Sequence, residues 1–165
     1  MGTDIFLSLV LVFLNGFFVA AEFAIVKVRS SQLELRARSG SFLARVTQSI
    51  SANLNAYLSA TQLGITLASL GLGWYAERLT ATVTVMLTGI SGVVLSEQAI
   101  HAIALPLAFG AITVLHIVLG ELVPKALAIR RSEVTALASA LPLRLFYIIF
   151  RPFIWIMDTL ANGAL

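Results

Sequence analysis

The chain has 165 residues, of which 59% are hydrophobic and only 12% are charged, whereas soluble domains average about 25% charged residues. This composition excludes a soluble globular domain and predicts a single all-α membrane domain covering residues 1–165. The chain has no cysteine, so a disulfide framework, a thiolate metal site and a cysteine nucleophile are excluded as well.

The first predicted transmembrane helix covers residues 5–28, where Glu22 is the one charged side chain before Lys27. At 1.5 Å per residue, this run reaches across the roughly 30 Å of a bilayer core. The tripeptide Val19-Ala20-Ala21 resembles a signal-peptide cleavage site. However, no Lys or Arg precedes it and the apolar run continues beyond it, so we expect the helix to be retained.

A polar stripe follows one side of this helix at seven-residue intervals: Ser8, Asn15, Glu22 and Arg29. Small and weakly polar residues commonly serve to pack membrane helices together, which is the structural alternative for Ser8 and Asn15. A carboxylate within a membrane span is costly, so Glu22 is a candidate functional residue.

Residues 31–52 predict an amphipathic helix in the headgroup region, because apolar residues recur opposite a basic side: Leu35, Phe42, Val46 and Ile50. The second predicted span, residues 54–76, carries many polar residues: Asn55, Ser59, Thr61, Gln62, Thr66 and Ser69. Such a helix persists in lipid only if protein or water covers its polar side. Residues 82–95 are apolar but too short to cross, and they either extend this helix or re-enter the membrane.

The third predicted span, residues 99–128, ends in the stretch Gly120-Glu121-Leu122-Val123-Pro124-Lys125. Pro124 has no amide hydrogen, so the carbonyl of Gly120 loses its helical partner. A free carbonyl beside a carboxylate forms an oxygen-rich pocket for a hard cation. The alternative is a proline kink in which Glu121 and Lys125 form an i,i+4 ion pair.

Further oxygen donors are available on the other spans, at Asn15, Thr66 and Ser69. His116 lies about 140° around an ideal helix from Glu121, so it is predicted to be a packed or cavity-lining residue, and His101 lies at the outer end. Ligation by oxygen alone favours Mg²⁺, Ca²⁺ or Na⁺ over zinc or copper.

The last segment, residues 133–158, is predicted to form a pair of short interfacial helices. Arg144, Arg151 and Asp158 recur every seven residues as one charged stripe, and Pro142 and Pro152 interrupt the run. A fourth span is the alternative.

The distribution of Lys and Arg predicts the orientation. Basic residues follow the first and third spans: Lys27, Arg29, Arg36, Arg38, Arg45, Lys125, Arg130, Arg131, Arg144 and Arg151. In residues 77–98, Arg78 is the only basic residue. We therefore expect a multi-pass protein of the cell membrane with its N-terminus outside and its C-terminus in the cytoplasm.

Three motifs in this order resemble the transmembrane domain of the CNNM/CorC magnesium transporters: Asn15-Gly16-Phe17-Phe18 through Ala21-Glu22-Phe23-Ala24, Thr61-Gln62-Leu63-Gly64-Ile65-Thr66-Leu67, and Gly120-Glu121-Leu122-Val123-Pro124-Lys125. The similarity covers essentially the whole chain. It implies a homodimer in the lipid bilayer, three spans in each protomer, and short helices that form a belt on the cytoplasmic side. It also implies Mg²⁺ export coupled to Na⁺ influx, and cytoplasmic CBS domains in the full-length protein.

The resemblance also implies a metal site, which we assign to Glu121, Ser69, Asn15 and the carbonyls of Gly120 and Ala20. Pro124, Lys125 and Glu22 are assigned to the helix break and the transport path, and Thr61, Gln62 and Thr66 to a sodium site. Two positions depart from the family pattern, because many relatives have a serine at Val19 and several have an asparagine at Ser69.

Two other classes of protein are alternatives to a transporter. A membrane anchor that only presents cytoplasmic domains explains the basic segments and predicts no cation dependence of stability. An intramembrane hydrolase lacks its usual motifs. We expect neither an enzyme nor a nucleic-acid partner. The small residues Gly64, Ala68 and Gly71, and the pair Gly89 and Gly92, permit helix contact between protomers or within one.

Overall fold

The computed structural model describes residues 2–91, 102 and 105–163, and every element in these ranges is helical. His101, Gly92 and the start of the third predicted span lie outside the described residues. The elements in chain order are α1 (Gly2–Lys27), α2 (Ser30–Arg38), α3 (Phe42–Ala52), α4 (Leu54–Ser91), α6 (Leu105–Ile117), a π-helical turn (Val118–Leu122), α7 (Val123–Arg130) and α8 (Ser132–Gly163).

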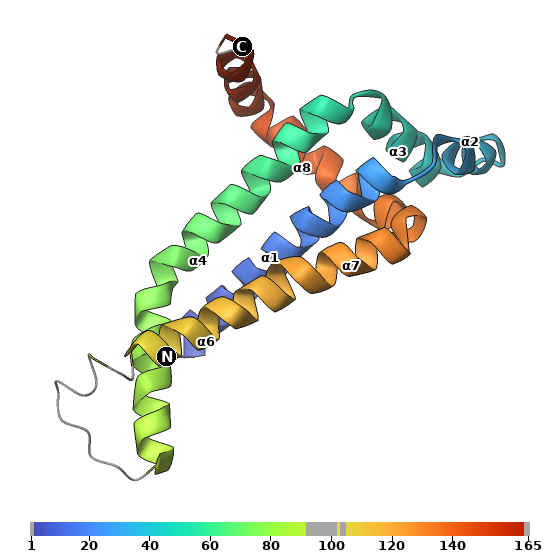
Figure 1. Cartoon of the computed structure of the whole chain (residues 1–165). Coiled ribbons are helices and arrows are strands. Elements are labelled where there is room, and N and C mark those ends of the chain that lie inside the picture. Colours follow the sequence, from blue (N-terminus) through green and yellow to red (C-terminus); the bar gives the residue numbers. More distant parts are fainter. Residues whose placement is uncertain (1, 92–101, 103–104, 164–165) are drawn as a thin grey trace.

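Three long rods lie side by side: α1, α4, and α6 continued by α7 (Figure 1). The helix α1 is central, because it packs against α4, α7 and α8 as well as the π-helical turn. The short helices α2 and α3 gather with α8 at one end of these rods (Figure 1). The all-α membrane architecture predicted from composition is thus confirmed.

Within the described residues, three helical segments are long and apolar enough to cross a membrane: Thr3–Lys27, Pro106–Arg130 and Ser132–Leu160. The segment from α4 is not among them, because Asn55, Gln62 and similar residues lower its hydropathy. Nevertheless α4 runs beside α1 (Figure 1). That residues 54–76 cross the bilayer and that residues 133–158 lie at its surface both stay predictions.

The single helix predicted over residues 31–52 is wrong, since a turn divides it into α2 and α3. Gly40 adopts a φ of 95° in this turn, a left-handed conformation that glycine reaches without a steric penalty. Ser41 then begins α3, where its hydroxyl accepts a hydrogen bond from the amide of Ala44 at 3.3 Å.

The pair of short helices predicted for residues 133–158 is also wrong, because α8 is one helix that contains both Pro142 and Pro152. Each proline removes one backbone hydrogen bond, and the neighbouring turns carry the helix past it. Likewise, α4 continues unbroken to Ser91. The predicted extension of the second helix is therefore confirmed as far as Ser91, and Glu77 and Arg78 belong to this helix rather than to a connection.

The main core forms where α1 meets α3, α4 and α8. Phe18 and Ile25 of α1 pack there with Ile50, Tyr57 and Leu143. A second cluster consists of alanines, where small side chains bring α1, α7 and α8 together: Ala24, Ala128 and Ala136.

Two of the small residues on α4 face α1 of the same chain. An ideal Cβ at Gly64 would lie 2.6 Å from ring carbons of Phe18, and one at Gly71 would lie 3.1 Å from a methyl group of Leu11. Glycine at these positions therefore permits packing within one protomer.

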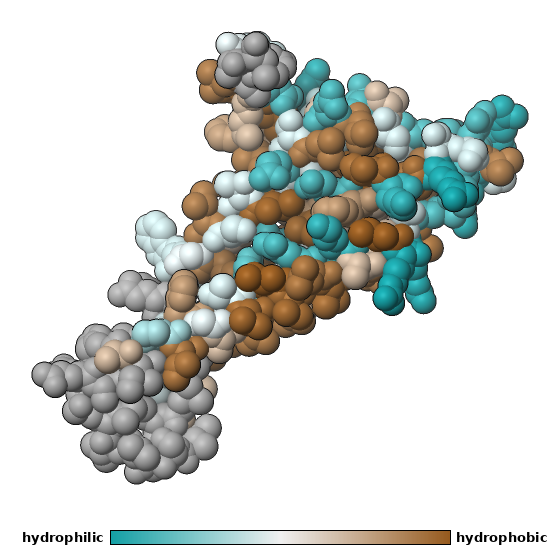
Figure 2. Space-filling model, viewed as in Figure 1, coloured by the Kyte–Doolittle hydropathy of each residue, from teal (hydrophilic) through white to brown (hydrophobic). Residues whose placement is uncertain are grey.

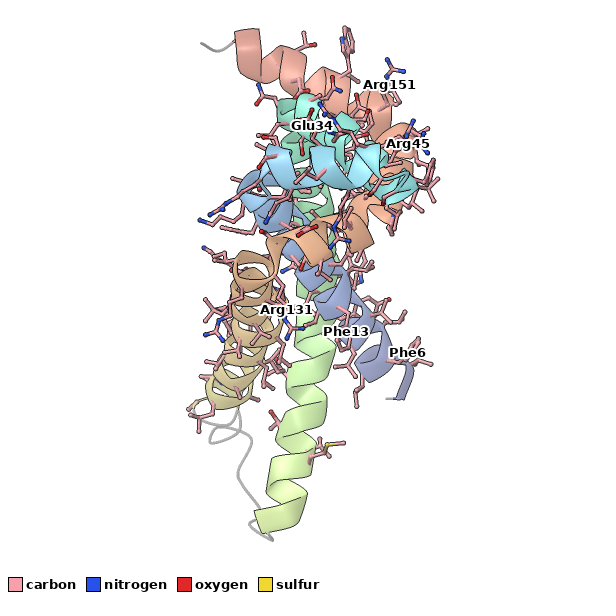
Figure 3. The ribbon with its side chains drawn as sticks, turned by 90° about the vertical axis from the view of Figure 1, so that its right-hand side faces the viewer. Phe6, Phe13, Glu34, Arg45, Arg131 and Arg151 are labelled. Atoms are coloured by element: carbon pink, nitrogen blue, oxygen red, sulfur yellow. The ribbon has the colours of Figure 1, made fainter. Side chains whose placement is uncertain are left out.

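The polar side chains collect at the end that carries α2 and α3, while apolar side chains cover the side formed by α6 and α7 (Figure 2). Glu34, Arg45 and Arg151 lie at this polar end, and Phe6 and Phe13 lie toward the other (Figure 3). One ion pair, Arg36 with Glu133, joins α2 to α8. This distribution matches the predicted division into a polar, basic end and an apolar membrane region, and the cytoplasmic position of the polar end stays a prediction.

Candidate functional site

Asn15 of α1 is fully buried and connects the three rods. Its amide nitrogen Nδ2 donates a hydrogen bond to the carbonyl oxygen of Gly120 at 3.1 Å. Its amide oxygen Oδ1 accepts a longer hydrogen bond, 3.4 Å, from the hydroxyl of Ser69 on α4. Three of the predicted ligand residues therefore lie together, in a layer that crosses the interior of the bundle.

The carbonyl of Gly120 lies in the π-helical turn Val118–Leu122, and the amide of the next residue, Val123, bonds the carbonyl of Val118 five residues earlier. Pro124 has no amide hydrogen to offer Gly120, as its ring predicted. However, this carbonyl is not free, because Asn15 supplies the missing donor from a distant part of the sequence. A cation at this oxygen would share it with Asn15 or displace the amide, because a carbonyl oxygen has two lone pairs.

Gly16, which the sequence analysis did not assign to the site, makes this contact between helices possible. An ideal Cβ at Gly16 would lie 2.9 Å from Cγ of Pro124 and 3.4 Å from the carbonyl oxygen of Leu119. Any larger residue would therefore force α1 away from the π-helical turn. The pair Asn15-Gly16 could have predicted this contact, because a small residue beside a polar one within a span is typical of helix–helix packing.

Glu121 follows Gly120, and its side chain is 48% exposed. Its carboxylate oxygen Oε1 lies 4.0 Å from Nε2 of His116, whose side chain is 16% exposed. The predicted separation of these residues around an ideal α-helix is wrong, because the π-helical turn brings positions five residues apart onto one side of the helix.

Lys125 points to α1, where its Nζ atom lies 4.4 Å from the ring centroid of Phe23. Among the described residues, no ion pair joins Lys125 to Glu121. The ion pair considered as an alternative is therefore absent, and a cation–π contact of about 0.5–2 kcal/mol takes its place.

Glu22 lies two turns from Asn15 on the same side of α1. Its Oε2 atom is buried and has no hydrogen-bond partner within the described ranges. Ala20 packs beside the alanine cluster of Ala24, Ala128 and Ala136. The close approach of α1 to the Gly120 carbonyl occurs one turn earlier, at Gly16, where an ideal Cβ would lie 3.7 Å from that oxygen.

The three residues assigned to a sodium site do not share one pocket in this conformation. Thr61 is fully buried, and its hydroxyl donates to the carbonyl of Leu58 at 2.8 Å. Thr66 is exposed and donates to the carbonyl of Gln62 at 2.8 Å, and Gln62 is exposed as well.

A small cavity of about 180 Å³ lies between α4 and α6, next to the layer of Asn15. Its polar lining comes from Ser69, Thr113 and His116, and its apolar lining from residues such as Phe109 and Ile112. In the part of the chain that the structure describes, no three His, Cys, Asp or Glu residues gather into a metal-binding group. Any cation here would be held by few charged groups together with neutral oxygens or water.

Long apolar helices around a buried polar layer define a multi-pass, all-helical membrane domain. Comparison with known proteins identifies its kind: the family model of CNNM, described as the Cyclin M transmembrane N-terminal domain, matches residues 6–165. The chain belongs to the CNNM family.

Several relatives come from Bacillus subtilis (strain 168). The UPF0053 protein YhdT is 44% identical over 153 residues, which cover 93% of this chain and 33% of the relative. The UPF0053 protein YrkA is 42% identical over 153 residues, which cover 92% of this chain and 35% of the relative. The chain thus spans about a third of the length of these relatives.

Proposed function

We propose that this domain exports Mg²⁺ from the cytoplasm in exchange for Na⁺ influx, and that the ion binds at the layer of Asn15, Ser69 and Gly120. Glu121 supplies the charge, and the carbonyl of Ala20 contributes on the cytoplasmic side of the layer. The observation that carries the proposal is the hydrogen bond from Asn15 to the Gly120 carbonyl, because it places exchangeable oxygens in the middle of a membrane bundle.

In this proposal, Asn15 occupies the Gly120 carbonyl until an ion binds. With no ion bound, its Nδ2 satisfies the Gly120 carbonyl, which is otherwise costly to bury in an apolar interior. When an ion binds, the amide turns so that Oδ1 and the released carbonyl both face the cation. Mg²⁺ requires oxygens at about 2.0–2.1 Å and gives up its water reluctantly, so this exchange of partners would control binding.

Two carboxylates near the polar layer favour a divalent ion. Glu121 lies beside the layer, and Glu22 holds a buried oxygen without a partner on the same side of α1 as Asn15. A bare carboxylate in a membrane interior costs several kcal/mol. A divalent cation that passes these two residues would offset that cost at Glu22, whose buried oxygen has no partner within the described ranges.

For Na⁺, the proposal requires a change of conformation in the middle of α4. Gln62 and Thr66 already share one exposed side of this helix, and the hydroxyl of Thr61 faces the core. Because all three residues lie on α4, only a local unwinding of this helix would bring Thr61 toward the other two and assemble a neutral oxygen site, as unwound helix segments do for Na⁺ in other transporters.

The test is Mg²⁺ flux in proteoliposomes loaded with a fluorescent Mg²⁺ indicator. Glu121→Gln is compared with Glu34→Gln, because Glu34 is exposed and bonds only Arg38 of its own helix within the described structure. We expect the parent and Glu34→Gln to carry Mg²⁺ and Glu121→Gln to lose the flux. Equal flux in all three proteins would disprove the site.

The relatives are about three times longer than this chain. This difference in length favours a second candidate function, an anchor that only presents other domains. Thermal unfolding in detergent separates the two proposals. Binding of Mg²⁺ to the folded state raises the unfolding temperature, whereas an anchor without a cation site unfolds at the same temperature with and without Mg²⁺.

A further inference from the structure

His116 and Glu121 form a pair that an ordinary α-helix cannot make. Five residues advance an α-helix by about 140° beyond a full turn, which would point the two side chains in different directions. The wider π-helical turn of residues Val118–Leu122 reduces this difference, and Nε2 and Oε1 lie 4.0 Å apart. The turn therefore places an imidazole beside the carboxylate that we assign to the cation.

Neither ring nitrogen of His116 makes a hydrogen bond within the described structure. Nε2 lies at the 4.0 Å distance from Glu121, and Nδ1 is buried without any partner. Nδ1 lies 3.5 Å from the position of an ideal Cβ on Gly120, next to the amide of Asn15. Buried polar side-chain atoms are nearly always hydrogen-bonded, so an imidazole left in this state suits a ligand that binds and leaves.

We propose that His116 and Glu121 act as a two-residue clip for first-row transition cations such as Mn²⁺, with one imidazole nitrogen and one carboxylate oxygen as ligands. This inference deepens the proposed function and rests on it, since it gives the same site a second class of ion. Metal–nitrogen and metal–oxygen bonds of about 2 Å each allow one cation to lie between donor atoms as far apart as these.

The rest of the coordination shell would be water and neutral oxygens. The cavity of about 180 Å³ adjoins the clip and has Ser69 and Thr113 in its lining. No third His, Cys or acidic residue joins the clip among residues 2–91 and 105–163. An incomplete protein shell distinguishes the clip from a closed structural metal site and suits a cation that is carried rather than stored.

Imidazole also changes which ions the site prefers. A nitrogen donor suits Mn²⁺ and the metals that follow it in the series, whereas carboxylate, carbonyl and water alone suit Mg²⁺. His116 would therefore determine specificity: it raises the affinity for transition cations and leaves the oxygen ligands of Mg²⁺ in place.

The experiment uses the whole chain in lipid nanodiscs with Mn²⁺ as the probe. Electron paramagnetic resonance counts bound Mn²⁺, and its electron spin-echo modulation detects a directly bound nitrogen. We expect nitrogen modulation in the parent and its loss in His116→Asn. Removing one ligand should weaken Mn²⁺ binding about ten-fold or more, a change of about 1.4 kcal/mol, while the affinity for Mg²⁺ stays nearly constant. His101→Asn, at the other histidine of the sequence, is the matched control and should behave as the parent.

Two results would overturn the clip. The first is Mn²⁺ bound to the parent without nitrogen modulation, which does not depend on how any variant folds. The second is an equal loss of Mn²⁺ and Mg²⁺ affinity in His116→Asn, which would show that the imidazole only supports the structure. Nitrogen-bound Mn²⁺ in a protein that carries no Mg²⁺ across liposomes would confirm the clip and disprove the proposed transport, so the two failures are distinguishable.

Discussion

Gly16 of α1 faces the ring of Pro124 so closely that an added Cβ would lie only 2.9 Å from Cγ of the proline. The contact joins two features that are far apart in the sequence: a glycine beside the buried Asn15, and the proline that interrupts the third rod. Proline removes a donor from the Gly120 carbonyl, and glycine lets the replacement donor come near enough to bond it. The two residues thus act together on one oxygen atom.

We predict that Gly16→Ala destabilises the protein by about 1–3 kcal/mol, because the added methyl group overpacks a contact that has no space for it. Its measurement is thermal unfolding in detergent. Gly73→Ala is the matched control, since an ideal Cβ there has no neighbour within 4 Å and alanine favours a helix interior by up to about 1 kcal/mol. Equal unfolding temperatures for the two variants would contradict the contact.

Asn15→Leu tests the polar layer. Leucine has a similar size but no donor, so the buried carbonyl of Gly120 would remain unsatisfied, at a cost of about 1–3 kcal/mol. We also expect the stabilisation by Mg²⁺ to disappear. Ser69→Ala removes only the longer bond of 3.4 Å, so its effect on unfolding should be smaller, about 1 kcal/mol or less. A larger loss from Ser69→Ala than from Asn15→Leu would show that Ser69 rather than Asn15 holds the layer.

The sequence predicted the parts of this site that local chemistry determines. The ring of Pro124 predicted the lost hydrogen bond at Gly120, and the polar stripe on the first span predicted which side of α1 faces inward. The stripe on the second span did not do the same for α4, because Gln62 and Thr66 are exposed. The partner of Gly120 could not be predicted, because Asn15 lies 105 residues away. Such a pairing depends on how the helices rotate and shift against one another, which a periodic pattern leaves open.

Other features escaped prediction because they break the regular helix. The distance between His116 and Glu121 depends on a π-helical turn, and a count of 100° per residue assumes that no such turn exists. The division of residues 31–52 was signalled by Ser39-Gly40-Ser41, a cluster typical of turns, but apolar residues continue with helical spacing on both sides of it. For residues 133–158 the prediction interrupted the helix at its two prolines, whereas α8 continues through both of them.

Gly64→Ala should destabilise the protein more than a change at an open glycine. The new Cβ would lie 2.6 Å from ring carbons of Phe18, which is 6% exposed and packs against Phe146 with ring centroids 4.7 Å apart. The ring cannot move away freely, so we expect a loss of about 1–3 kcal/mol. Gly110→Ala on α6 is the control, because an ideal Cβ there meets no described atom within 4 Å apart from its own helix backbone and chain neighbours.

A second substitution tests whether Phe18 causes this loss. Phe18→Leu makes room for the new methyl group, so the double variant should be more stable than the sum of the two single changes predicts. The coupling expected for residues in direct contact is about 0.5–3 kcal/mol. Additive effects of Gly64→Ala and Phe18→Leu on the free energy of unfolding would show that the two residues do not meet.

The chain has no cysteine, so single cysteines at Thr3, Ser39, Ser132 and Gly163 can report which side of the membrane each position faces. Since Lys and Arg are retained in the cytoplasm, a membrane-impermeant maleimide on intact cells should label Thr3→Cys alone, and the other three should react only after the cells are opened. Labelling of Gly163→Cys on intact cells would show that α8 crosses as a fourth span. Labelling of Ser132→Cys would show that α4 does not cross, and the polar layer between Asn15 and Ser69 would then need a different membrane placement.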